Sequence, residues 1–114
     1  MDAISSVLIN KALDGLSARA VATAHNIANA NSPGYRPVRV TFEEALSQAA
    51  GRGSEAVRAV VPRTEQAPAP AFGSEMRLDL ELATAAETAN RYAALVDLLG
   101  RQMQITRTVI RGGQ

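Results

Sequence analysis

Cysteine and tryptophan are absent from this 114-residue chain, and histidine occurs only once, at His25. Without cysteine the chain forms neither a disulfide nor a thiolate metal site. His25 has no acidic cluster at ligand spacing beside it, and the usual metal sites require three or four donors. We therefore expect no metal site.

Aromatic residues make up only 4% of the sequence, although hydrophobic residues make up 46%. Alanine supplies much of that apolar fraction; it favours helices but buries little area. A chain of this length forms one small domain. Its core should therefore be thin, and we expect partners to complete the burial of its apolar surface.

A surplus of charge and a long apolar run are also missing. The chain has 12 basic and 11 acidic residues, whereas a nucleic-acid binder usually carries a basic surplus. No apolar run reaches the ~18–20 residues of a membrane span. The first residues also lack the pattern of a cleaved signal peptide. We expect a protein that binds no nucleic acid, does not span a membrane, and stays in the cytoplasm or leaves without a cleaved signal.

Catalytic motifs are absent as well. The sequence has no G-x-S-x-G elbow, no G-x-G-x-x-G loop and no phosphate-binding loop. Glu43 and Glu44 are adjacent, and adjacent helical residues do not face each other, so we interpret them as a helix start. We expect no catalytic residue, no cofactor and no small-molecule substrate, and we predict that the protein is not an enzyme.

The first long element is a helix predicted over residues 3–30. Gly15 is a mild defect in this helix, because glycine lowers helix stability by about 1 kcal/mol relative to alanine. Apolar residues recur every seven positions, which is typical of a coiled-coil seam. One row of this seam is Leu13, Ala20 and Ile27, and the other is Ile9, Leu16, Thr23 and Ala30.

The helix should end in a turn built from residues 32–35. Ser32-Pro33-Gly34-Tyr35 fits a type II turn, with proline second and glycine third. We expect the preceding asparagine amides to satisfy carbonyls at the helix end, and Tyr35 to anchor the turn. A short extended segment over 38–42 and a short helix from Phe42 to about Ala50 should follow, with Thr41 and Glu44 as a capping box.

Residues 51–77 differ in composition. Three of the five prolines and three of the eight glycines lie within 51–75. Val57, Val60 and Val61 could pair as a brief strand, but we predict a flexible loop overall.

The second long helix is predicted over residues 79–111, with Asp79 at its start. Its acidic residues lie early and its arginines late, which matches the helix dipole. One apolar row is Leu82, Ala89, Val96, Met103 and Ile110, and the other is Ala85, Tyr92, Leu99 and Thr106. This seam should face Leu13, Leu16, Ala20 and Ile27, either within one chain or between copies.

These elements predict a mainly α fold in which long N- and C-terminal helices pair as an antiparallel coiled coil. The expected parts are 1–50, with the first helix, the turn and the short helix; 51–77, the flexible loop; and 78–114, with the second helix. Two alanine-rich helices are barely enough for a stable monomer, so packing between copies is favoured over a closed hairpin.

Residues 26–35 resemble the signature of bacterial flagellar rod and hook proteins: Asn, apolar, Ala, Asn, a short pair, Ser or Thr, Pro, Gly, then an aromatic residue. The acidic and apolar residues 78–81, ahead of a heptad helix, resemble the second hallmark of that family. The short length, residues 90–92 and residues 98–103 are most similar to proximal rod proteins of the B type. The residues of the resulting assembly motif are Asn26, Ile27, Asn29, Asn31, Pro33, Gly34 and Tyr35.

The resemblance implies a structural subunit of the basal-body rod, the hollow drive shaft that crosses the periplasm. Its partners would be copies of itself, other rod proteins, and components of the rod base and the export apparatus. Such subunits leave the cell through the flagellar type III apparatus without a cleaved signal. The alternative is a cytoplasmic helical-hairpin adaptor or export chaperone that binds a partner's helix in the same apolar stripe.

Overall fold

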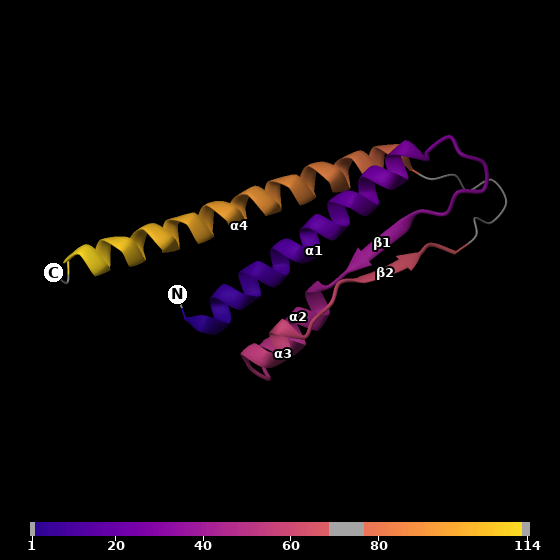
Figure 1. Cartoon of the computed structure of the whole chain (residues 1–114). Coiled ribbons are helices and arrows are strands. Elements are labelled where there is room, and N and C mark those ends of the chain that lie inside the picture. Colours follow the sequence, from indigo (N-terminus) through magenta and orange to yellow (C-terminus); the bar gives the residue numbers. More distant parts are fainter. Residues whose placement is uncertain (1, 69–76, 113–114) are drawn as a thin grey trace.

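The computed structural model describes residues 2–68 and 77–112, and it is mainly helical. Two long helices contact each other, and two short helices and a two-stranded sheet accompany them (Figure 1). The elements in chain order are α1 (Ala3–Ala28), β1 (Val38–Thr41), α2 (Glu43–Ala50), α3 (Ser54–Arg58), β2 (Arg63–Gln66) and α4 (Leu78–Gly112).

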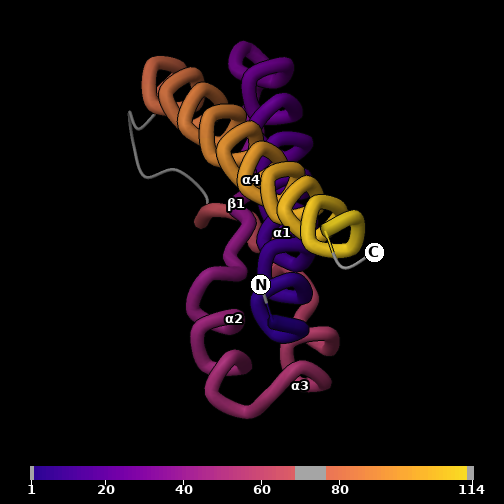
Figure 2. The backbone as a smooth tube through the Cα atoms, turned by 90° about the vertical axis from the view of Figure 1, so that its left-hand side faces the viewer, coloured from indigo at the N-terminus to yellow at the C-terminus, as the bar shows by residue number. Residues whose placement is uncertain are grey.

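Helix α1 lies between the other parts of the molecule. Helix α4 runs along one side of α1 in the opposite direction, while the sheet, α2 and α3 pack on another side (Figures 1 and 2). The expected mainly helical fold with long, contacting terminal helices is therefore confirmed. The small sheet was not part of that expectation.

Helix α1 is capped at both ends by its own sequence. The Asp2 side chain accepts a hydrogen bond from the Ser5 backbone N–H at 2.8 Å. The helix ends at Ala28, two residues before the predicted Ala30, because the backbone tightens there: the Ala30 N–H bonds to the Ile27 carbonyl. This tightening precedes Pro33, which disfavours helical geometry for the residue before it.

The prediction of a flexible loop over 51–77 needs correction across its first part. Residues 54–58 form α3, and β2 pairs antiparallel with β1, with Val38 opposite Gln66 and Thr41 opposite Arg63. Val57 lies in α3 rather than in a strand, and its side chain is 0% exposed. Burial of Val57 and pairing with β1 order this segment, which local composition does not reveal. Residues 69–76 lie outside the described residues.

The predicted caps of two helices are also wrong. Helix α2 begins at Glu43 with Phe42 at its N-cap, and no side chain caps it. Thr41 is the last residue of β1 and lies one position before this N-cap, so the predicted capping box between Thr41 and Glu44 does not form. Helix α4 begins at Leu78, so Asp79 lies inside the first turn, where it pairs with Arg77.

The apolar core lies where α1 meets the small elements. Its buried members are Leu16, Val40, Phe42, Leu46, Ala49 and Val57. Gly15 of α1 makes this packing possible, because a Cβ built there would lie 2.4 Å from Cγ of Phe42. Gly15 is therefore a docking position for the Phe42 ring rather than a mild helix defect.

We expect Gly15→Ala to lower the free energy of unfolding by about 1–3 kcal/mol, although alanine is the better helix former. The added methyl group would displace the Phe42 ring from α1. Urea unfolding followed by circular dichroism measures the change. Gly100→Ala is the matched control, since a Cβ at Gly100 of α4 meets nothing within 4 Å and should stabilise the helix. A Gly15→Ala protein as stable as wild type would contradict the close contact.

Candidate assembly site

A buried polar cluster joins the end of α1 to the start of α4. Asn26 is 0% exposed, and its Nδ2 donates to the Val38 carbonyl at 2.9 Å and to Glu81 Oε2 at 3.0 Å. Its Oδ1 accepts from the Val38 N–H at 2.8 Å and from the Tyr35 hydroxyl at 2.7 Å. Asn26 therefore connects α1, the turn, β1 and α4.

Glu81 is the acidic member of this cluster and is only 1% exposed. Its second oxygen, Oε1, accepts from the Arg39 guanidinium at 2.5 Å. Asn26, Tyr35, Arg39 and Glu81 are called the polar corner below. A buried carboxylate costs several kcal/mol unless it is paired and hydrogen-bonded, and Glu81 is both.

Tyr35 acts in the polar corner as a hydrogen-bond donor. Burial raises the pKa of the Tyr35 hydroxyl, and the nearby charge of Glu81 raises it further. The hydroxyl therefore stays protonated and keeps its bond to Asn26. The ring also meets His25 edge-on, with the ring centroids 5.7 Å apart. The expectation that Tyr35 anchors the turn agrees with these contacts.

The predicted turn is confirmed by its backbone. Gly34 has φ = 72°, and the Tyr35 N–H donates to the Ser32 carbonyl at 3.2 Å. Asn29 binds a carbonyl at the helix end twice: the His25 carbonyl accepts from Asn29 Nδ2 at 2.9 Å and from the Asn29 N–H at 3.1 Å. The Ser32 hydroxyl donates to Asn29 Oδ1 at 3.1 Å.

The motif residues do not all have the same role. Asn26 is buried; Ile27, Asn29 and Tyr35 are half-buried; and Asn31, Pro33 and Gly34 are exposed. The structure therefore separates a part that holds the chain together from a part that faces outward. The exposed residues are the ones free to contact another molecule.

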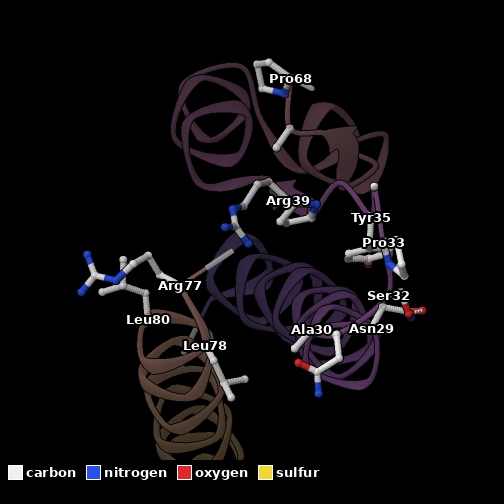
Figure 3. A pocket seen from close by; sticks show the side chains of 14 residues that line it. Asn29, Ala30, Ser32, Pro33, Tyr35, Arg39, Pro68, Arg77, Leu78 and Leu80 are labelled. Carbon is white, nitrogen blue, oxygen red and sulfur yellow. Dashed lines mark hydrogen bonds between the residues drawn. The ribbon is translucent and has the colours of Figure 1, made fainter. Parts of the chain in front are cut away.

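An open hollow of about 720 Å³ lies beside the turn. Figure 3 shows residues of the turn on one side and Arg77, Leu78 and Leu80 at the start of α4 on the other. The described residues that line it include amides, prolines, two arginines and leucines, and they contain no nucleophile–base pair. Within residues 2–68 and 77–112, no group of three or more His, Asp or Glu side chains could hold a metal ion.

The face of α4 that contacts α1 lies beside the predicted Leu82 row. It includes two members of the predicted Ala85 row. Residues buried or half-buried there are Glu81, Thr84, Ala85, Thr88, Leu95, Leu99 and Gln102. The predicted residues Ala85 and Leu99 belong to this set. Those that remain exposed in the single chain are Leu82, Ala89, Tyr92, Val96, Met103 and Ile110. The buried row of α4 thus begins with a glutamate and a threonine, which apolar periodicity could not identify.

On α1 the predicted seam is divided in the same way. Leu16 is buried, Leu13 and Ile27 are half-buried, and Ala20 is exposed. In the companion row, Ile9, Leu16 and Thr23 are buried and Ala30 is half-buried. Within one chain, therefore, the Ile9 row contributes to burial along its whole length, the Leu13 and Ala85 rows contribute in part, and the Leu82 row stays exposed.

A second charged cluster, which the sequence did not indicate, fastens α2 to α1. Arg19 forms a two-pronged pair with Glu43, with both N–O distances at 2.7 Å, and also donates to the Val40 carbonyl at 2.8 Å. Its guanidinium lies 4.8 Å from the centre of the Phe42 ring. The one signal available was Arg19 itself, a lone arginine among small residues of α1.

We expect the Arg19–Glu43 pair to make stability fall in acid. The hydrogen bonds that Glu43 accepts from Arg19 lower the pKa of the Glu43 carboxyl from 4.5 to about 2. Because the folded-state pKa is the lower one, the pair's contribution is complete above pH 4.5 and is lost as pH falls toward 2. The Glu43 side chain is half exposed, and solvent weakens an exposed ion pair. We therefore expect the pair to contribute only about 1 kcal/mol to the free energy of unfolding.

The measurement is the free energy of unfolding of wild type and Glu43→Gln between pH 2 and 7. The two proteins should differ near neutrality and approach each other as pH falls toward 2, because Glu43 becomes protonated over this range. Glu44→Gln, one residue along α2, is the control and should follow the wild-type curve. A constant difference between wild type and Glu43→Gln across this range would contradict the assignment.

A smaller apolar hollow lies between α1 and α4. It measures about 300 Å³ and is lined by Ala12, Leu16, Phe42, Ala94 and Leu95, with Glu43 and Arg91 at its edge. The two long helices separate toward the N-terminus of α1 and the C-terminus of α4 (Figures 1 and 2). The hollow thus lies where their contact opens.

No protein-family model matches the chain, and no curated protein matches it. None of the helices in residues 2–68 and 77–112 combines the length and apolar character that a membrane span requires.

Proposed function

We propose that the protein is a structural subunit that assembles through packing of its long helices. The observation that carries this proposal is the apolar surface left open along α4: Met103 is 53% exposed and Ile110 is 63% exposed. A contiguous apolar face of this kind is typical of an interaction surface. Each square ångström of apolar surface removed from water would contribute about 25 cal/mol, which has to exceed the entropic cost of association.

The particular subunit we propose is a rod protein of the bacterial flagellar basal body, of the proximal B type. Support comes from the resemblance of residues 26–35 and 78–81 to the family's two hallmarks. These two stretches meet in the polar corner, where Asn26 donates to Glu81. A motif split between the ends of the chain thus has a shared physical role, which is to hold α4 against α1.

In this proposal α1 and α4 pair as an antiparallel coiled coil, and copies polymerise into the hollow drive shaft needed for motility. The partners are further copies, other rod proteins, and components of the rod base and the export apparatus. The subunit reaches the rod through the type III apparatus without a cleaved signal. The protein has no catalytic role and no cofactor.

A cytoplasmic adaptor or export chaperone is the second candidate, and the hollow between α1 and α4 favours it. That apolar space, lined by Leu16, Phe42 and Leu95, could receive a side chain from a partner's helix. Cell fractionation separates the two proposals. Protein in purified basal bodies supports the rod subunit, whereas protein confined to the soluble cytoplasm supports the adaptor.

We expect Met103→Asp to abolish rod assembly and motility while leaving the monomer folded. Met103 is exposed in the single chain, so a carboxylate there costs little until packing between copies would bury it. The measurements are swimming in soft agar, electron microscopy of isolated basal bodies, and circular dichroism of the purified variant.

Gln104→Asp is the control, because Gln104 is exposed on α4 next to Met103 but points about 100° further around the helix. It should leave motility unchanged. A motile strain carrying Met103→Asp would refute this use of the α4 face. A normal rod in a strain lacking the protein would refute the rod assignment itself.

A further inference from the structure

The contact between α1 and α4 ends before α4 does. Positions Glu81, Thr88, Leu95 and Gln102 recur every seven residues and are buried or half-buried. The next position in this row, Val109, is 68% exposed. The face that packs against α1 therefore continues along α4 after α1 has moved away from it.

The end of α4 remains strongly apolar over this uncovered stretch. Residues 103–112 are called the α4 tail below, and every one of them is exposed. Its exposed large apolar side chains are Met103, Ile105, Val109 and Ile110. Residues 103–112 span about 15 Å of helix at 1.5 Å per residue.

The surface that α4 leaves open on α1 is also apolar. The helices separate over the N-terminal half of α1 (Figure 1), and the 300 Å³ hollow lies at the opening between them. We call this opening the wedge, defined by Ala12, Leu16, Phe42, Ala94 and Leu95. Its walls are the continuation of a helix contact that the chain already makes.

Charge disfavours a symmetric contact between two tails. The charged residues of the tail are Arg107 and Arg111, and no acidic residue follows Asp97 in the sequence. Two tails side by side would bring arginines against arginines, which is unfavourable. Among the described residues, no ion pair involves Arg107 or Arg111. The wedge carries both Glu43 and Arg91 at its edge, so it lacks this one-signed charge.

We propose that the α4 tail of one copy packs in the wedge of a second copy, with an apolar tail side chain filling the hollow. This inference rests on the proposed self-assembly and names the two surfaces that meet. Each copy then has one free tail and one free wedge. A tail–wedge contact that the second copy does not return is heterologous, and it continues from copy to copy rather than closing as a two-fold dimer does.

The absence of cysteine allows a direct test, because every thiol in the experiment is introduced. Full-length chains carrying Ala12→Cys are mixed with chains carrying Met103→Cys or Ile110→Cys, and the mixtures are oxidised mildly. A disulfide forms only when the two Cα atoms approach within about 7 Å. We expect the mixture to shift to twice the monomer mass on a non-reducing gel, with both chains in the product.

Ala24→Cys replaces Ala12→Cys in the control, since Ala24 is exposed on α1 and does not line the hollow. A second variant, Ala94→Trp, fills the hollow and should cause loss of polymer seen by electron microscopy. Ala24→Trp should leave the polymer unchanged. Circular dichroism verifies that each variant folds.

The outcomes separate this inference from the proposed function. Polymers that form normally with Ala94→Trp, or that cross-link through Ala24→Cys and not Ala12→Cys, overturn the wedge contact while self-assembly stands. Homodimers of Met103→Cys without cross-linking to Ala12→Cys would show tail-to-tail packing and also overturn it. Chains that remain monomeric at all concentrations and do not enter basal bodies overturn both.

Discussion

Asn26→Leu is expected to lower the free energy of unfolding by about 3–5 kcal/mol, which is a large part of the stability of a small domain. Leucine is similar in size but forms none of the hydrogen bonds that Asn26 makes with Val38, Tyr35 and Glu81. The carboxylate of Glu81 would stay buried with one partner fewer. Urea unfolding of the purified protein measures the loss.

Two further variants make this prediction specific. Asn31→Leu, at an exposed position of the same motif, should change stability by less than about 0.5 kcal/mol. The double variant Asn26→Leu/Glu81→Leu should recover much of the loss, because it removes the stranded carboxylate as well as the amide. Equal losses at Asn26 and Asn31 would contradict a special role for the buried amide.

Phe42→Ala is expected to cost about 3–5 kcal/mol and to release the small elements from α1. The Phe42 ring is buried, rests on Gly15, and lies beneath the Arg19 guanidinium. Hydrogen exchange should show lost protection in α2, α3 and the sheet, with protection retained where α1 contacts α4.

A control variant and a coupling test make this prediction specific. Val61→Ala, at a side chain that is 77% exposed, should be close to neutral. Gly15→Ala should cost little in the Phe42→Ala background, because the ring it would strike is gone. Additive losses from Gly15→Ala and Phe42→Ala would show that the two residues do not interact.

The polar corner could be predicted from the sequence only in part. The run of asparagines, the proline and the glycine indicated a helix end and a turn, because each constrains the backbone locally. The same run did not distinguish Asn26, which is buried, from Asn31, which is exposed. That distinction depends on Glu81, which lies 55 residues away in the sequence.

The α4 face illustrates the same limit. Heptad spacing correctly indicated one long helix, and Ala85 and Leu99 lie half-buried as part of its contact face. Spacing gave no reason to bury Glu81 or Thr88, since polar residues are normally placed outside a seam. Partners from α1 and β1 satisfy Glu81, and this shifts the contact face away from the predicted row by one residue.

The sequence by itself determined the two long helices, the turn between α1 and β1, and the absence of cysteine chemistry. These properties depend on residue type and on spacing within a few turns of chain. Only the tertiary structure decided that Gly15 receives the Phe42 ring, that residues 54–66 are ordered, and that the polar corner joins both ends of the chain. Each of these depends on atoms that are distant in sequence and come into contact only when the chain is folded.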